Sequence, residues 1–256
     1  MPESITARVR GGEVVIGTFV FEFATAGIGR LAAGAGAEFV VYDGEHTGWS
    51  WETLGKLVAT TRPTSAVPLI RIPGTDRTFV SRALDVGARG IIAPMVGTAE
   101  QARRIVEWAK YPPVGSRGAA FSIAHDDYAA GAPADKIAFA NEDNLVITQI
   151  ETAQGLENAE EIAGVDGVDV LWVGHFDLTN SMGIPGQFDH PDYFAALDRV
   201  SAAAKAHGKV AGFMPTDPKM AADLVSRGFT LLAYGGDLWV YQQALAAGIK
   251  EVRDQL

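Results

Sequence analysis

The chain has 256 residues, of which 48% are hydrophobic and 20% charged, as in ordinary globular proteins. Its net charge of −10, from 31 acidic and 21 basic residues, argues against binding to the phosphate backbone of nucleic acids. The absence of cysteine excludes disulfides, thiolate nucleophiles and cysteine-ligated metal centres. No secretory signal is visible, and no apolar run reaches the ~18 residues of a membrane span, so we expect a cytoplasmic protein without membrane contact.

Short apolar runs alternate with helical stretches from one end of the chain to the other. The predicted strands are residues 14–21, 39–45, 67–72, 90–96, 145–151, 169–174, 209–214 and 229–235. The predicted helices are residues 24–35, 50–61, 76–87, 98–109, 154–163, 191–207, 217–227 and 237–254. Eight strands, each followed by a helix, predict a single α/β domain over residues 1–256, a (β/α)8 TIM barrel. An open doubly wound sheet is the alternative, but the glycine-rich turn expected after its first strand is missing.

Several residues mark where these elements begin, and one connection is unusually long. Ser50, Thr98 and Asp217 have the positions of helix N-caps, and proline follows Asp217 at the first helical position. The connection over residues 111–144 exceeds the usual length, and long loops in compact domains tend to be functional or mobile.

Two carboxylates follow neighbouring predicted strands and form the strongest candidate site. Glu151 ends the fifth apolar run and Asp177 ends the sixth. In a TIM barrel, polar residues at the C-terminal ends of several strands form the active site. Two carboxylates, with the remaining positions left to water and substrate oxygens, are typical of Mg²⁺ or Mn²⁺. Either residue alone could instead cap a helix, but the pair together favours a metal site.

Three further polar residues lie close to this pair in the predicted barrel. Gln149 precedes Glu151 by two residues and so points to the same side of its strand, where it could bind a substrate oxygen or simply be a satisfied interior amide. Arg71 ends the third strand, and its guanidinium suits a carboxylate or phosphate, with an ion pair to Asp43 or Glu45 as the alternative. His46 follows the second strand and is a candidate general base.

The lysines argue against one chemical mechanism. They fall on predicted helices and loops or, for Lys209, at the start of a strand. None ends a strand, where a Schiff-base lysine would be expected. If the substrate is a ketone, the residues therefore favour a metal as the electron sink.

Six motifs, in order, resemble the HpcH/HpaI class II pyruvate aldolases. They are D-G-E-H (43–46), R-I-P (71–73), L-D-V-G-A-R-G-I-I-A-P (84–94), Y-P-P-V-G-S-R-G (111–118), Q-I-E-T (149–152) and G-H-F-D-L (174–178). The resemblance covers roughly residues 14 to 240. It implies a barrel of the phosphoenolpyruvate/pyruvate type and reversible, metal-dependent cleavage of a 4-hydroxy-2-oxo acid to an aldehyde and pyruvate or a related 2-oxo acid such as hydroxypyruvate.

The resemblance also assigns roles to individual residues. It implies that Glu151 and Asp177 bind a divalent metal, Mg²⁺ or Mn²⁺, with Co²⁺ and Zn²⁺ as alternatives. Arg71, helped by Gln149, would hold the 2-oxo acid beside Gly174. His46 would be the base, acting directly or through a metal-bound water. Asp85 would orient it.

The chain departs from the family pattern at the mouth of the site. G-H-F-D-L stands where the family usually has G-P-A-D-L, and T-G-W-S-W follows E-H in place of A-P. The aromatic residues Trp49, Trp51 and Phe176 are therefore predicted to shape the aldehyde pocket, with loop anchoring or a subunit contact as the alternative. The family further implies a homo-oligomer, a trimer or hexamer, with exchanged C-terminal helices and L-W-V-Y (238–241) at the interface.

Two other functions remain open. One is a lyase of the same barrel group that acts on a CoA thioester of the malyl or citramalyl type, although the acidic chain shows no clear basic patch for the CoA phosphates. The other is a non-catalytic barrel that binds an organic acid. The presence of His46, Arg71, Glu151 and Asp177 together argues against it.

Overall fold

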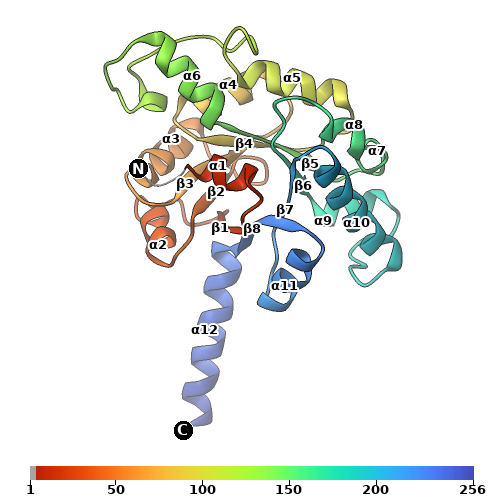
Figure 1. Ribbon diagram of the computed structural model, residues 1–256. Coiled ribbons are helices and arrows are strands. Elements are labelled where there is room, and N and C mark those ends of the chain that lie inside the picture. Colours follow the sequence, from red (N-terminus) through yellow and green to blue (C-terminus); the bar gives the residue numbers. More distant parts are fainter. Residues whose placement is uncertain (1–3) are drawn as a thin grey trace.

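The computed structural model describes residues 4–256, which form a closed barrel of eight parallel strands (Figure 1). The strands are β1 (Val15–Val20), β2 (Phe39–Asp43), β3 (Val67–Arg71), β4 (Gly90–Ala93), β5 (Leu145–Ile150), β6 (Val170–Val173), β7 (Val210–Phe213) and β8 (Phe229–Gly236). Each strand lies beside the next one in the chain, and β8 pairs with β1. The predicted (β/α)8 TIM barrel is confirmed.

All eight predicted helical regions contain helix, and the structure adds others. The helices are α1 (Ile5–Arg10), α2 (Ile28–Gly34), α3 (Trp51–Thr61), α4 (Arg77–Asp85), α5 (Ala99–Ala109), α6 (Pro133–Asp143), α7 (Ala153–Glu157), α8 (Ala159–Ala163), α9 (His175–Ser181), α10 (Pro191–Ala206), α11 (Pro218–Ser226) and α12 (Asp237–Asp254), with a short 3-10 helix at Ala124–Asp126. Helices α1, α6 and α9 were not predicted, and α7 and α8 divide one predicted helix at Asn158. The side chains of Ser50, Thr98 and Asp217 accept first-turn backbone N–H groups, as their N-cap positions predict.

The alternation of side chains along each strand produces two apolar layers. On β2, Phe39 and Val41 point into the barrel, whereas Val40 and Tyr42 belong to the layer between barrel and helices. Both sets are fully buried, which explains why the strands read as continuous apolar runs. The interior layer also includes Ile5 and Val9 of α1, so this helix closes the N-terminal end of the barrel.

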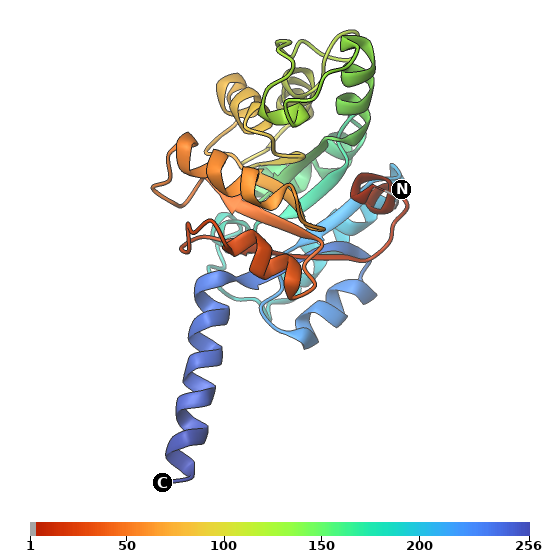
Figure 2. The same cartoon turned by 90° about the vertical axis from the view of Figure 1, so that its left-hand side faces the viewer.

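Helix α12 differs from the other helices because it leaves the body of the molecule. Figures 1 and 2 show it extending from the end of β8, away from the barrel, in both views. None of its residues is buried. Within residues 4–256, no helix has the length and apolar character needed to cross a membrane.

Candidate active site

One cavity of about 420 Å³ at the C-terminal end of the barrel brings together most of the predicted site residues. Its polar lining includes His46, Arg71, Gln149, Glu151 and Asp177. Its remaining lining is largely aromatic and apolar and comprises Phe19, Phe21, Trp172, Val173, His175, Phe176, Met214, Leu238 and Trp239, with Gly174 and Glu22. These side chains converge because parallel strands place all their C-terminal ends at one face of the barrel.

Arg71 is held by two carboxylates of the D-G-E-H segment. Asp43 and Arg71 are in register across β2 and β3, and the Arg71 Nε lies 2.6 Å from Asp43 Oδ1 and 3.3 Å from Glu45 Oε2. The ion-pair alternative considered for Arg71 is therefore present in the structure. This ion pair does not use all the hydrogen-bond donors of the guanidinium, because the two Nη groups make no hydrogen bond within residues 4–256. These groups remain available for an anion in the cavity.

Glu45 is a partly buried acidic residue, which the sequence suggested only as an ion-pair partner of Arg71. Burial raises its pKa to about 7; Asp43 and Asp177 also raise it, and Arg71 opposes them. Its Oε2 atom is buried without a hydrogen-bond partner among the described residues. Its position in D-G-E-H, directly before His46, was the one signal that could have identified it.

Gln149 and Glu151 point to the same side of β5, as their spacing predicts. The Gln149 Nε2 donates a hydrogen bond to Glu151 Oε2 at 2.5 Å, and the Met95 backbone N–H donates to Glu151 Oε1 at 2.5 Å. Gln149 Oε1 is buried and has no partner within residues 4–256. Burial raises the pKa of Glu151 to about 7, and the nearby charges of Glu45 and Asp177 add to the increase.

Asp177 lies in the first turn of α9, four residues beyond the end of β6, rather than at the strand end itself. Its side chain still reaches the cavity that Glu151 lines. The negative charge of Asp177 raises the cost of ionising Glu45 and Glu151, and the charge of Glu45 raises that of Glu151 as well. A divalent cation would offset that cost, so these residues fit the predicted metal.

The number of acidic side chains available as ligands determines which metal ions the site can suit. Across residues 4–256, no group of three or more His, Asp or Glu side chains is arranged to hold a metal ion. Mg²⁺ commonly uses one or two carboxylates and keeps several waters, so the pair Glu151 and Asp177 is compatible with it.

His46 lies at the mouth of the cavity, three residues beyond β2, with 58% of its side chain exposed. Its Nε2 is 3.6 Å from Glu45 Oε2. The prediction that Asp85 orients His46 is wrong within this chain. Asp85 ends α4 and forms an ion pair with Arg117 at 2.8 Å instead. Arg117 belongs to the long 111–144 connection, and the strand pattern could not predict the path of that connection.

An aromatic wall adjoins the metal-ligand candidates. The His175 ring packs against Phe176, Phe188 and Phe213, with centroids 4.6, 5.4 and 5.1 Å away. Burial lowers the pKa of His175 to about 4, and the charge of Arg71 lowers it further. Phe176 has 63% of its surface exposed and lines the cavity. Its contact with the substrate stays a prediction.

Trp49 and Trp51 do not share this position. Both pack against the apolar layer between barrel and helices, and Trp51 stacks on Phe79 with centroids 6.3 Å apart. Neither lines the cavity. The predicted contact of Trp49 with substrate is therefore corrected to loop anchoring, the alternative given for it.

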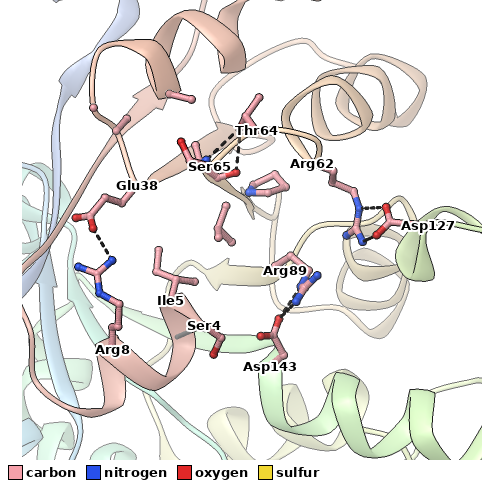
Figure 3. Close-up of a pocket in the computed structure, with 16 residues that line it drawn as sticks. Ser4, Ile5, Arg8, Glu38, Arg62, Thr64, Ser65, Arg89, Asp127 and Asp143 are labelled. Carbon is pink, nitrogen blue, oxygen red and sulfur yellow. Dashed lines mark hydrogen bonds and ion pairs between the residues drawn. The ribbon is translucent and has the colours of Figure 1, made fainter. Parts of the chain in front are cut away.

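A second cavity, of about 540 Å³ (Figure 3), is lined by Glu38, Val67 and Arg89 at the starts of β2, β3 and β4, so it lies at the N-terminal end of the barrel. Three arginines line it, but each is paired with a carboxylate: Arg8 with Glu38, Arg62 with Asp127 and Arg89 with Asp143. Figure 3 shows these pairs around the rim. Because active sites of TIM barrels lie at the C-terminal end, the first cavity is the candidate active site.

Comparison with known proteins identifies the family to which the chain belongs. Residues 17–244 match the family described as HpcH/HpaI aldolase/citrate lyase. A 2-keto-3-deoxy-L-rhamnonate aldolase of Klebsiella pneumoniae is 35% identical over 236 residues, which cover 91% of this chain and 87% of the relative. The crystal structure of an HpcH/HpaI aldolase from Desulfitobacterium hafniense has a TM-score of 0.93 at 33% identity and covers 98% of this chain and 96% of its own. An HpcH/HpaI aldolase/citrate lyase family protein from Burkholderia cenocepacia has a TM-score of 0.91 at 30% identity, with 97% and 98% coverage.

Proposed function

Because the chain belongs to the HpcH/HpaI aldolase/citrate lyase family, we propose that it cleaves a 2-keto-3-deoxy sugar acid, or a related 4-hydroxy-2-oxo acid, into pyruvate and an aldehyde. The predicted reaction class, a carbon–carbon lyase of the class II aldolase type, is confirmed by the family match and the named relatives. One observation carries the substrate proposal. A fixed cation, Arg71, and two acidic residues, Glu151 and Asp177, line the same cavity.

Arg71 and Gln149 are suited to bind the 2-oxo-acid end of the substrate. The two Nη groups of Arg71 make no hydrogen bond within residues 4–256, while its Nε is fixed by Asp43 and Glu45. A fixed guanidinium presents its donors to a carboxylate without reorganisation. Gln149 is fixed in turn by its hydrogen bond to Glu151.

Glu151 and Asp177 would hold the divalent metal. When bound, the metal supplies a Lewis acid that stabilises negative charge developing on the keto oxygen. The Met95 N–H and the Gln149 amide orient the Glu151 carboxylate, which limits its freedom to turn away from the cavity.

His46 would exchange the proton of the C4 hydroxyl group. In the cleavage direction it accepts that proton while the C3–C4 bond breaks, the aldehyde leaves, and the electron pair of the bond stays on C3 of the pyruvate enolate. The enolate then takes up a proton at C3 to give pyruvate, and the exposed position of His46 lets its proton exchange with solvent. The same groups act in reverse during aldol addition.

The assembled protein is proposed to be a homo-oligomer in which α12 packs against another copy. This helix has no buried residue and carries a series of exposed apolar side chains, namely Trp239, Val240, Tyr241, Leu245, Ile249 and Val252. Apolar surface of this kind on a long helix is typical of a protein–protein interface. Exchange of α12 between copies, in a trimer or hexamer, is the arrangement we propose.

The CoA-thioester alternative has less support from the cavity. The phosphates of CoA require several cations, and among the lining residues Arg71 is the one with a permanent positive charge. Its partners Asp43 and Glu45 already offset that charge.

The direct test is an aldol cleavage assay with 2-keto-3-deoxy-L-rhamnonate and other 2-keto-3-deoxy sugar acids, in which released pyruvate is measured. The assay is run on protein treated with EDTA and again after Mg²⁺, Mn²⁺, Co²⁺ or Zn²⁺ is added. We expect pyruvate release only with metal. Full activity in metal-free protein would contradict the role of Glu151 and Asp177, and cleavage of malyl-CoA but of no free 2-oxo acid would favour the alternative.

A further inference from the structure

One carboxylate, that of Asp237, holds the segment that follows β1 at the mouth of the cavity. Its Oδ1 accepts hydrogen bonds from the backbone N–H groups of Phe21 and Glu22 at 2.8 and 3.3 Å. Its Oδ2 accepts from Glu22 and Phe23 at 3.1 and 2.7 Å. Asp237 is also the first residue of α12, where the positive end of the helix macrodipole favours a carboxylate. The first turn of α12 and residues 21–23 are therefore fixed to each other.

The segment held in this way contains Phe21, which contacts the site arginine. The Phe21 ring stacks on Phe19, with centroids 5.2 Å apart and planes inclined by 16°. The Arg71 Cζ lies 5.7 Å from the centroid of Phe21 and 5.3 Å from that of Phe19. A guanidinium at these distances is attracted to the ring faces, and the attraction strengthens where water is excluded. Arg71 thus has two kinds of neighbours. The carboxylates of Asp43 and Glu45 pair with its Nε, and the rings of Phe19 and Phe21 lie against its guanidinium group.

Aromatic contacts continue from this segment into α12. Trp239 meets the Phe21 ring edge-on at 5.1 Å, and Tyr241 meets Phe23 in the same way at 5.5 Å. Beyond its first turns, α12 extends away from the barrel (Figure 2). A change in the orientation of α12 would therefore be transmitted to the cavity by residues 21–23.

We propose that Asp237 is a positioning residue for the 2-oxo-acid site, which acts through Phe21 to hold the stacked rings of Phe19 and Phe21 against Arg71. This inference rests on the proposed function, in which Arg71 binds the carboxylate of the 2-oxo acid. Loss of the Asp237 carboxylate would release three backbone N–H groups and allow Phe21 to move away from Arg71. It would leave His46, Glu151 and Asp177 unchanged. The Michaelis constant for the 2-oxo acid should therefore rise while kcat changes little.

The test compares Asp237→Ala, Asp237→Asn, Phe21→Leu and the Asp237→Ala/Phe21→Leu double variant in the full-length, metal-supplemented protein. In the aldol direction we expect Asp237→Ala to raise KM for pyruvate by about 3- to 30-fold, the range of one cation–π contact. The change in kcat should stay below about threefold. Asp237→Asn should have a smaller effect, because its carbonyl oxygen still accepts one or two of the N–H groups. The double variant should be no worse than the weaker-binding single variant, because both changes act through one contact.

Asp217→Ala is the matched control. Asp217 also accepts backbone N–H groups at a helix start, those of Lys219 and Met220, but it does not line the cavity. Its removal should leave KM for pyruvate unchanged. A wild-type KM in Asp237→Ala, a loss confined to kcat, or fully additive effects in the double variant would each overturn the proposal. If Asp237→Ala does not fold, a wild-type KM in Phe21→Leu does the same. Wild-type protein that binds no 2-oxo acid would instead refute the proposed function.

Discussion

Gly174 lies directly against the carboxylate of Glu151. A Cβ atom on Gly174 would stand 2.3 Å from Glu151 Oε2, 2.8 Å from Glu151 Cβ and 3.1 Å from Gln149 Nε2. The φ of Gly174 is −89°, which any residue adopts, so glycine is required here by space and not by backbone conformation. Gly174 is thus the residue that lets Glu151 reach its place beside the cavity.

This contact predicts a specific loss in Gly174→Ala. The added methyl group should displace the Glu151 carboxylate, lower kcat/KM by about 10²-fold and weaken metal binding, because catalytic groups lose their effect when moved by about 1 Å. The change in unfolding free energy should be about 1–3 kcal/mol, typical of overpacking. Gly48→Ala is the control, since a Cβ there meets open space. Equal activity in the two variants would contradict the role given to Gly174.

Substitution of His46 and substitution of Arg71 should change different kinetic parameters. Removal of a general base typically lowers the rate by about 10²–10⁴-fold, so His46→Ala should reduce kcat and leave metal binding intact. Arg71→Ala should chiefly raise KM for the 2-oxo acid, because the carboxylate loses its guanidinium partner. Steady-state kinetics with metal titration provide the measurement. Near wild-type cleavage by His46→Ala would assign proton transfer to another group.

The stability of the protein should depend on the protonation of His175. Its pKa is about 4 in the fold, below its ordinary value of 6.5, so the unfolded chain binds the proton more readily. The stabilising contribution of neutral His175 is complete above pH 6.5 and is lost as pH falls towards 4, with a slope of at most about 1.4 kcal/mol per pH unit.

The corresponding measurement is thermal unfolding of wild type and His175→Phe between pH 4 and 8 in EDTA. The Tm of His175→Phe should rise relative to that of wild type as pH falls below 6.5. Above pH 6.5 the difference between the two Tm values should stay constant. His207→Gln, which removes an imidazole at the C-terminal end of α10, controls for general histidine titration. Parallel curves for wild type and His175→Phe would show that His175 titrates normally.

Phe176 should affect the choice of aldehyde more than the binding of pyruvate. It lines the cavity with most of its ring exposed and packs edge-on against Phe188 at 5.2 Å. Phe176→Ala should change the ratio of kcat/KM values between competing aldehydes by about 10-fold, the discrimination expected from one apolar contact. The measurement is kcat/KM for a panel of aldehydes at saturating pyruvate. Trp51→Ala, which alters core packing and not the cavity, should leave that ranking unchanged.

The sequence by itself determined the barrel and the face on which its chemistry lies. Apolar runs of strand length, alternating with capped helices, left few alternatives to eight parallel strands. Parallel strands then place Arg71 and Glu151 at one end, and the two-residue period places Gln149 beside Glu151. These features follow from local propensity and periodicity, which are properties of short segments.

Only the tertiary structure decided which distant side chains meet. Asp85 pairs with Arg117 of the long connection, Trp49 packs against the core, and Asp237 binds the segment at residues 21–23, more than 200 positions earlier. The pKa of Glu45, which burial raises to about 7, likewise depends on charges from separate elements, those of Arg71, Asp43 and Asp177. Such features depend on the path of loops and on the sum of contacts from separate elements, which no local pattern in the chain encodes.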